Sequence, residues 1–112
     1  YERFPEKKIQ VLAELEERRD PRIAAAVLPF IRDMNETARL HAMGALLRQA
    51  DAAPFVDAVV DAFLEEESAR IRATVLDRLA AASLPVGARQ AEVAARMPSG
   101  YKLDAGGVPQ RS

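Results

Sequence analysis

The sequence predicts an all-α protein built from antiparallel helix pairs that pack side by side. Composition is the first observation behind this prediction, because 49% of the 112 residues are apolar but only 5% are aromatic. Alanine and leucine supply much of the apolar share, and both residues favour helices. The second observation is the spacing of apolar residues by three and four positions between proline-marked turns. The third is an internal repeat with a period of 33 residues.

The first two predicted helices lie on either side of Pro21. Residues 6–19 form a helix whose apolar face is Ile9, Leu12 and Leu15. Asp20 then reads as an N-cap, with Pro21 at the first helical position. The second helix extends to residue 34, and its apolar stripe is Ile23, Val27, Phe30, Ile31 and Met34. Pro29 lies on the opposite face and should bend this helix, because proline removes an internal hydrogen bond.

Three further helices and a tail follow. Asn35 is placed to cap a helix that runs to about Ala50, the next helix lies within residues 51–66, and another starts near Ser68. Their apolar faces are Leu40, Met43, Leu46, Leu47 and Ala50; Phe55, Val56, Val59 and Phe63; and Ile71, Val75, Leu79 and Ala82. A short terminal helix is predicted within residues 85–97. The tail, with apolar residues at alternate positions before Gly-Gly, forms either a small β-hairpin or a frayed end.

The repeat becomes visible when the chain is overlaid on itself with a shift of 33 residues. The matched pairs are Pro21 with Pro54, Ile23 with Val56, Val27 with Val60, Phe30 with Phe63, Ile31 with Leu64, Ala38 with Ile71, Arg39 with Arg72, Ala42 with Val75 and Leu46 with Leu79. Shifts of 31 or 32 residues also align some positions of the second helices. One helix pair cannot bury its apolar face alone, so neighbouring pairs must stack. We therefore expect a single domain, residues 1–112, with a half repeat at 6–19, repeats at 21–50 and 52–83, a terminal helix at 85–97 and a tail at 99–112.

Over residues 8–84 this pattern resembles HEAT repeats, especially the short bacterial kind. Two features carry the resemblance. The first is an acid at the turn between the helices of a pair, followed by an arginine early in the second helix: Asp33 with Arg39, and Glu66 with Arg72. The second is a proline that bends the first helix, Pro29.

The resemblance implies a right-handed α-α superhelix in which the second helix of each pair lines a concave surface. Pro29 matches the bent first helix of the family, although the next repeat has no proline there. The resemblance also implies a structural role for Arg39 and Arg72. A buried arginine is costly unless it is paired. The carboxylates of Asp33 and Glu66, or loop carbonyl groups, would satisfy the guanidinium groups and hold the repeats in register.

The implied concave surface would carry a strip of mixed polar side chains. Its residues are Gln10, Glu14, His41, Arg48, Arg70 and Asp77. Such a strip suits a protein or peptide partner, so we expect a non-enzymatic scaffold. A solvated face without a partner is an equally good interpretation of the same residues.

No pattern in the sequence predicts a catalytic, metal or cofactor site. The chain has no cysteine, and its one histidine, His41, is expected to be an ordinary surface residue. The acidic run Glu65–Glu67 lacks the alternating ligand spacing of a calcium loop. Asp57 and Asp61 share a helix face but should be exposed, whereas a general acid needs a perturbing environment. We therefore expect no enzyme activity and no cofactor.

Charge narrows the range of partners. Sixteen lysines and arginines against seventeen acids give a net charge of -1, and the pI is about 5.9, which disfavours nucleic acid and anionic membranes as partners. No apolar run approaches the roughly 20 residues of a membrane span, and no signal peptide is evident, so a cytoplasmic location is expected. Two alternatives implied by the resemblance stay open: a bilin-lyase-like HEAT protein that handles tetrapyrroles, and a HEAT-like nucleic-acid-processing protein such as a DNA glycosylase.

The first residues suggest how the ends of the stack are covered. The chain begins with tyrosine instead of methionine, so we expect it to be the C-terminal part of a longer solenoid. An upstream repeat or a second copy of the chain would then cover Phe4, Ile9, Val11 and Leu12. The tail would seal the last repeat, as terminal units of repeat proteins must.

Overall fold

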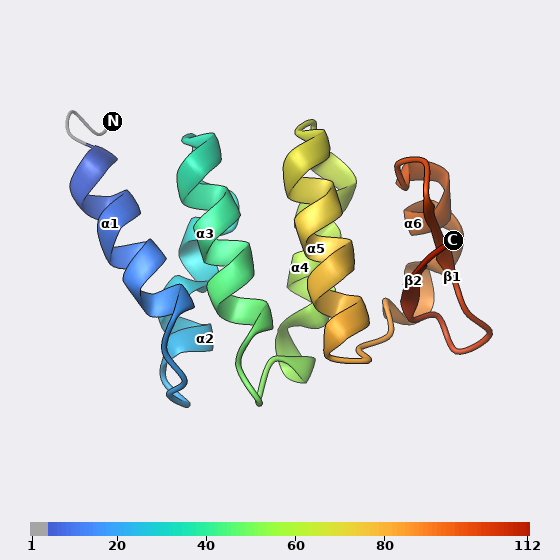
Figure 1. The fold of residues 1–112 in the computed structure, drawn as a ribbon, viewed down its shortest axis with the longest axis horizontal. Helices are drawn as coiled ribbons and strands as arrows, with labels where there is room; N and C mark the ends of the chain where they lie inside the picture. The colour runs from blue at the N-terminus through green and yellow to red at the C-terminus, as the bar shows by residue number, and fades with distance from the viewer. Residues whose placement is uncertain (1–4) are drawn as a thin grey trace.

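The computed structural model describes residues 5–112 and contains two layers of helices. The helices of one layer are α1 (Pro5–Glu16), α3 (Glu36–Leu47) and α5 (Ala69–Ala81), and those of the other are α2 (Ile23–Val27), α4 (Val56–Glu65) and α6 (Gln90–Arg96). Helices α1, α3 and α5 stand side by side and run in the same direction, with α2 and α4 behind them (Figure 1). The chain ends in a hairpin of β1 (Tyr101–Leu103) and β2 (Pro109–Arg111). The all-α class with a C-terminal hairpin is therefore confirmed.

Side-chain caps mark the starts of α3 and α5, the second and third helices of the first layer. Asn35 has an extended backbone, and its side chain accepts a hydrogen bond from the Ala38 N–H at 3.0 Å. Ser68 does the same for α5, accepting from the Ile71 N–H at 3.3 Å. Each cap satisfies an N–H group that has no partner inside its helix, which fixes where the helix begins.

The expectation that Pro29 bends one continuous helix is wrong. Helix α2 ends at Val27, and residues Leu28–Phe30 form a separate 3₁₀ turn that contains the proline. Proline cannot donate the hydrogen bond that would continue the α-helix, so the chain tightens and then turns. As a consequence Met34, predicted to lie in the apolar stripe, is 89% exposed, because the helical periodicity stops before that residue.

Helix α3 is the centre of the core. It packs against α1, α2 and α5, and every residue from Ala42 to Leu47 is buried. Large buried side chains from the neighbouring helices surround it, among them Val27, Val59, Phe63, Ile71, Leu76 and Leu79. Burying one such side chain stabilises the fold by roughly 1.5–3 kcal/mol relative to leaving it in water.

The hairpin occupies the place beside α5 where a further helix of that layer would stand. It packs against α5 and α6, and its strands pair antiparallel with Tyr101 opposite Arg111. Asp104 organises the turn, because its carboxylate accepts hydrogen bonds from the N–H groups of Gly106 and Val108. These bonds hold the pKa of Asp104 below its ordinary value, with the Val108 N–H as the largest cause. The tail is thus an ordered hairpin packed against α5 and α6.

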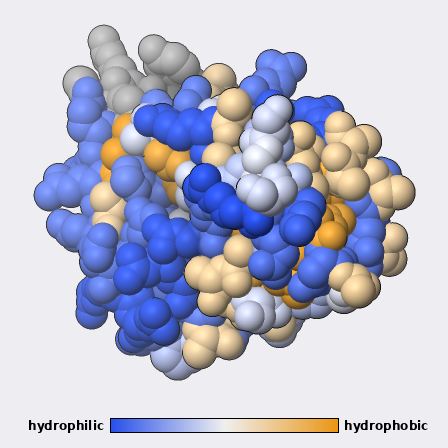
Figure 2. All heavy atoms as spheres, turned by 45° about the vertical axis from the view of Figure 1, so that its right-hand side comes forward, coloured by the Kyte–Doolittle hydropathy of each residue, from blue (hydrophilic) through white to orange (hydrophobic). Residues whose placement is uncertain are grey.

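The surface that includes the hairpin is mostly hydrophilic. Figure 2 brings this end of the molecule forward and shows polar residues over much of it, with apolar residues in small separate patches. Within residues 5–112, no helix has the length and apolarity that crossing a membrane would require.

Candidate functional site

The six residues predicted to meet a partner lie on the three helices of the first layer, whose outer surface we call the α1–α3–α5 face. Gln10 and Glu14 are exposed on α1, and Arg70 is exposed on α5. The remaining three, His41, Arg48 and Asp77, are half-buried. The structure therefore divides the predicted strip into residues that are open to solvent and residues that other side chains of this chain engage.

Asp77 is bound by the hairpin, although its side chain stays 42% exposed. Its carboxylate accepts a hydrogen bond from the Tyr101 hydroxyl at 2.8 Å and pairs with the Arg111 guanidinium at 3.0 and 3.2 Å. The same guanidinium lies over the Tyr101 ring, 5.0 Å from its centre. Burial and the bond to Asp77 raise the pKa of Tyr101. Asp77 therefore fastens the C-terminal cap to α5.

Arg70 links α5 to α3 near the N-terminal ends of both helices. Its guanidinium lies 3.2 Å from the carboxylate of Glu36 at the start of α3, and the hydroxyl of Ser68 donates to the same carboxylate at 3.1 Å. Both charged side chains are at least half exposed, so this contact is weak in water.

His41 is not the ordinary surface histidine that the sequence predicted. Its Nδ1 lies 2.8 Å from Glu16 Oε1, and its side chain is 26% exposed. The other oxygen of Glu16 accepts a hydrogen bond from Arg78 Nη2 at 3.0 Å. The Glu16 carboxylate on α1 thus connects His41 of α3 with Arg78 of α5. These residues lie 25 and 62 positions from Glu16 in the chain.

Gly44 makes this connection sterically feasible. It lies in the middle of α3, and a Cβ atom at this position would overlap the Glu16 carboxylate. Only glycine leaves room for the Glu16 side chain to cross α3 and reach Arg78. Glycine inside a predicted helix is the one sequence signal that could have pointed to this crossing.

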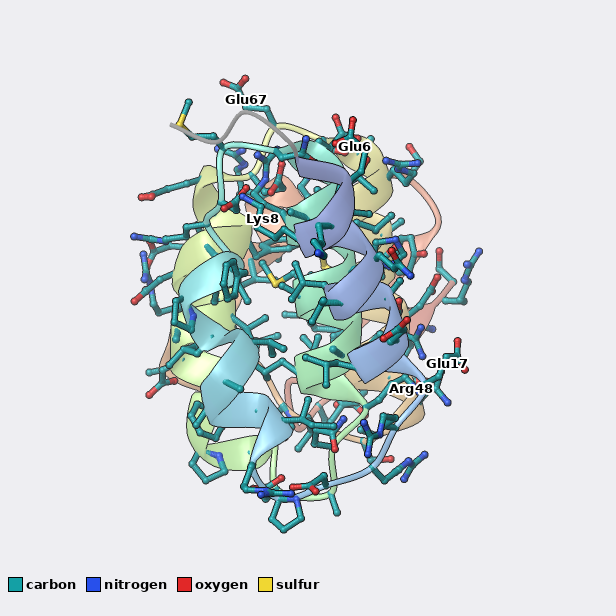
Figure 3. All side chains as sticks on the ribbon, turned by 90° about the vertical axis from the view of Figure 1, so that its left-hand side faces the viewer. Glu6, Lys8, Glu17, Arg48 and Glu67 are labelled. Atoms are coloured by element: carbon teal, nitrogen blue, oxygen red, sulfur yellow. The ribbon has the colours of Figure 1, made fainter. Side chains whose placement is uncertain are left out.

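A pocket of about 460 Å³ opens near the C-terminal ends of α3 and α5. We call it the arginine pocket, because Arg19, Arg48 and Arg78 all line it. Its other lining residues are Leu47, Gln49, Ala50, Ala52, Ala53, Ala81, Ala82 and Leu84. Figure 3 shows Arg48 beside Glu17 at this edge of the molecule, but their closest charged atoms are 3.8 Å apart.

Buried Gln49 supports the wall of this pocket. Its side-chain oxygen accepts from the Asp20 N–H at 3.1 Å, and its amide nitrogen donates to the carbonyl oxygens of Arg18 and Ala45 at 3.0 and 2.9 Å. These bonds tie the loop after α1 to the end of α3. Arg19 and Arg48 are thereby held on the same side of the molecule.

A second set of ion pairs lies near the N-terminal ends of α3 and α5. In each, an acid in the turn before one helix pairs with a cation on the previous helix of the same layer. The Asp33 carboxylate accepts a hydrogen bond from Lys8 Nζ of α1 at 3.0 Å. The Glu66 carboxylate accepts two parallel hydrogen bonds from the Arg39 guanidinium of α3, with N–O distances of 2.8 and 3.1 Å. Each acid also accepts a backbone N–H two residues later, from Asn35 and Ser68. The carboxylate that Arg39 uses is therefore that of the following repeat, and Asp33 offers it only a backbone carbonyl, at 2.9 Å.

Arg72 is the third cation in this series, and no carboxylate of the described residues pairs with it. Its Nη1 donates to the Glu66 carbonyl at 2.7 Å, which repeats the contact of Arg39 with its own turn. In the part of the chain that the structure describes, its buried Nε has no hydrogen-bond partner. The residue in the place of the acid is Met97, whose N–H closes the end of α6 as that of Glu66 closes the end of α4.

A separate groove runs between α1 and α2 at the N-terminal end. Leu12, Leu15, Val27 and Phe30 are among its lining residues, and Val11 is 49% exposed beside them. Leu12, which was expected to need a cover from outside, is already 97% buried by this chain, with 3% exposed. Ile9 is half-buried against the core, and the predicted contribution of Phe4 lies outside the described residues.

Comparison with protein-family models, curated proteins and solved structures finds no match to this chain. Within residues 5–112, no group of three or more histidine, aspartate or glutamate side chains has the arrangement to hold a metal ion. The candidate site therefore stands on its own geometry, which is a polar face with a basic pocket at one end.

Proposed function

We propose that this protein is a non-enzymatic interaction module of the HEAT-repeat type, whose α1–α3–α5 face binds a protein or peptide partner. The observation that carries this proposal is the series of turn contacts, Lys8 with Asp33 and Arg39 with Glu66. Each contact joins one helix pair to the next at the same level. That arrangement is expected of stacked repeats, which offer one continuous surface for binding.

The proposal includes a right-handed superhelix in which the α1–α3–α5 face is concave, and a cytoplasmic setting. The hairpin is the C-terminal cap of the stack in this proposal, because it packs along the side of α5 and is bonded to it through Asp77. At the opposite end, the groove between α1 and α2 is the surface where an upstream repeat or a second copy would pack. Val11 is the residue whose exposure supports this part of the proposal.

Site-directed photo-crosslinking tests the binding face. A crosslinking amino acid at Gln10 or Glu14 is expected to capture a partner in cells, whereas the same group at Ala25, exposed on α2 of the other layer, is not. Changing both Arg48 and Arg70 to glutamate should abolish capture from Gln10. Equal capture from Gln10 and Ala25, or capture that the double substitution leaves intact, would contradict the proposal.

A further inference from the structure

The arginine pocket holds more cationic than anionic groups. Arg78 shares the Glu16 carboxylate with His41. Arg48 is 3.8 Å from Glu17, which is 76% exposed, and this distance is too long for a hydrogen bond. Among the described residues, no side chain pairs with Arg19. Three arginines therefore line a pocket that has no acidic residue in its wall.

Helix ends account for part of this gathering of charge. Arg48 is the C-cap of α3 and Arg78 lies in the last turn of α5, where the helix dipole favours a cation. That effect operates equally well on side chains that extend into water. It does not explain why the three residues surround one pocket whose remaining wall is mainly alanine and leucine.

We propose that the arginine pocket binds the carboxylate side chains of an acidic peptide segment, an inference that rests on the proposed function and specifies its partner. Glu16 is evidence for the ligand chemistry, because it already presents a carboxylate to Arg78 at 3.0 Å. The alanines at the mouth, of which Ala50, Ala81 and Ala82 are exposed, give an apolar surface for residues next to the acid. A short segment of acidic and small apolar residues matches both parts of the wall.

A peptide suits the charge of the whole molecule better than a polyanion does. The chain carries a net charge of -1, so an extended nucleic acid would meet repulsion outside the pocket. A local pair or triplet of carboxylates meets mainly the three arginines. Arginine is well matched to carboxylate because its planar group donates two parallel hydrogen bonds.

Glu16 acts in this proposal as an internal competitor for the ligand. A peptide carboxylate that engages Arg78 must share it with Glu16 or displace Glu16 from it. Removing the charge of Glu16 therefore frees Arg78 and removes a repelling group near the pocket. The affinity for an acidic peptide should therefore rise when Glu16 is neutral.

Fluorescence anisotropy at low ionic strength tests the proposal with the full chain. The probe is a labelled nine-residue peptide with three glutamates separated by alanine and leucine, and the control peptide has glutamine at the three positions. We expect the R19Q/R48Q variant to bind the acidic peptide about tenfold more weakly and E16Q to bind it several-fold more tightly. R32Q is the matched control, because Arg32 pairs with Glu65 outside the pocket, and it should bind like the wild type.

Three results would overturn the inference: equal binding of the acidic and glutamine peptides, wild-type affinity in R19Q/R48Q, or displacement of the peptide by equimolar inorganic phosphate. Circular dichroism melts confirm that each variant is folded, and R19Q alone serves if the double variant is not, since Arg19 is exposed. A failed peptide experiment with intact crosslinking from Gln10 would remove this inference alone. Peptide binding without face-specific crosslinking would instead remove the proposed function.

Discussion

Arg39 and Glu66 form a forked ion pair that joins α3 to the turn after α4, and the Glu66 side chain is only 4% exposed. The Arg39 side chain is 21% exposed, and its guanidinium also donates to the carbonyl groups of its own turn. A carboxylate this buried is stable only because Arg39 and the Ser68 N–H both bind it.

Glu66→Gln should therefore be clearly destabilising. The amide keeps the shape of the side chain but leaves the buried part of Arg39 without its counter-charge, so we expect a loss of about 2–3 kcal/mol in the free energy of unfolding. Urea denaturation measures it. Glu65→Gln is the control, since Glu65 is 63% exposed in its pair with Arg32 and should cost below about 1 kcal/mol. Similar losses in both variants would contradict the importance of the buried pair.

Gly44→Ala should disrupt the contacts of Glu16 with His41 and Arg78 while leaving the free energy of unfolding nearly unchanged. Alanine gains about 1 kcal/mol over glycine inside a helix, while its Cβ expels the Glu16 carboxylate from its place. We expect the free energy of unfolding to change by less than about 1 kcal/mol. The side-chain NMR signals of His41 and Arg78 should shift together. In an E16A background, which lacks the side chain that a Cβ atom at position 44 would displace, the same substitution should leave the Arg78 signal unmoved, and a shift there would refute the crossing as the cause.

Met97→Glu should complete the series of turn contacts. Met97 stands where Asp33 and Glu66 stand in the earlier turns, and its backbone angles (φ -72°, ψ 136°) are close to those of Glu66 (φ -74°, ψ 127°). A glutamate there can accept a hydrogen bond from Arg72 Nε, which has no partner among the described residues. Satisfying a buried donor stabilises the folded state by about 1 kcal/mol or more. Thermal melts should show a higher Tm for this variant than for Met97→Gln. A lower Tm than in the glutamine control would show that Arg72 cannot reach the new carboxylate.

Asp33 makes the N-terminal contact sensitive to acid. Burial raises the pKa of Asp33, but the Asn35 N–H and Lys8 outweigh it, so the pKa falls below the ordinary 3.8. A lowered pKa in the folded state gives stability that is present above pH 3.8 and is lost as the pH falls through the folded value. Asp33→Asn should therefore be less stable than the wild type at pH 7, by about 1 kcal/mol, and the difference should shrink near pH 2. Asp51→Asn, at an exposed position, is the control and should leave the stability at pH 7 almost unchanged.

Tyr101 makes the attachment of the hairpin sensitive to base. Because burial and Asp77 raise its pKa, the Tyr101–Asp77 contact stabilises the hairpin fully below pH 10 and loses this contribution as the pH rises through the raised value. Tyr101→Phe should speed hydrogen exchange of the hairpin amides at neutral pH and leave the core of α3 unchanged. In the wild type, the same loosening should come only at alkaline pH. Slow hairpin exchange in the variant would mean that Arg111 alone holds the cap.

Local signals in the sequence determined most of the helical framework. The caps at Asn35 and Ser68 and the 3.6-residue apolar pattern were sufficient for the helices, since both act within a few residues. The same pattern failed at Met34, because it assumed that the helix continues past Pro29. The sequence predicts an acid and an arginine at each turn but not which of them pair, because Arg39 and Glu66 are 27 residues apart in the chain and meet only once the helices have packed.

Periodicity by itself therefore determined which side of each helix is apolar, and with it the all-α class and the paired helices of this protein. Tertiary structure alone decided which charges meet. Glu16 reaches Arg78 across 62 residues because α1, α3 and α5 lie in one row and Gly44 leaves space between them. The arginine pocket arises in the same way, from three helix ends brought to one edge. Electrostatic energy depends on distances in space, and those distances exist only once the helices have packed.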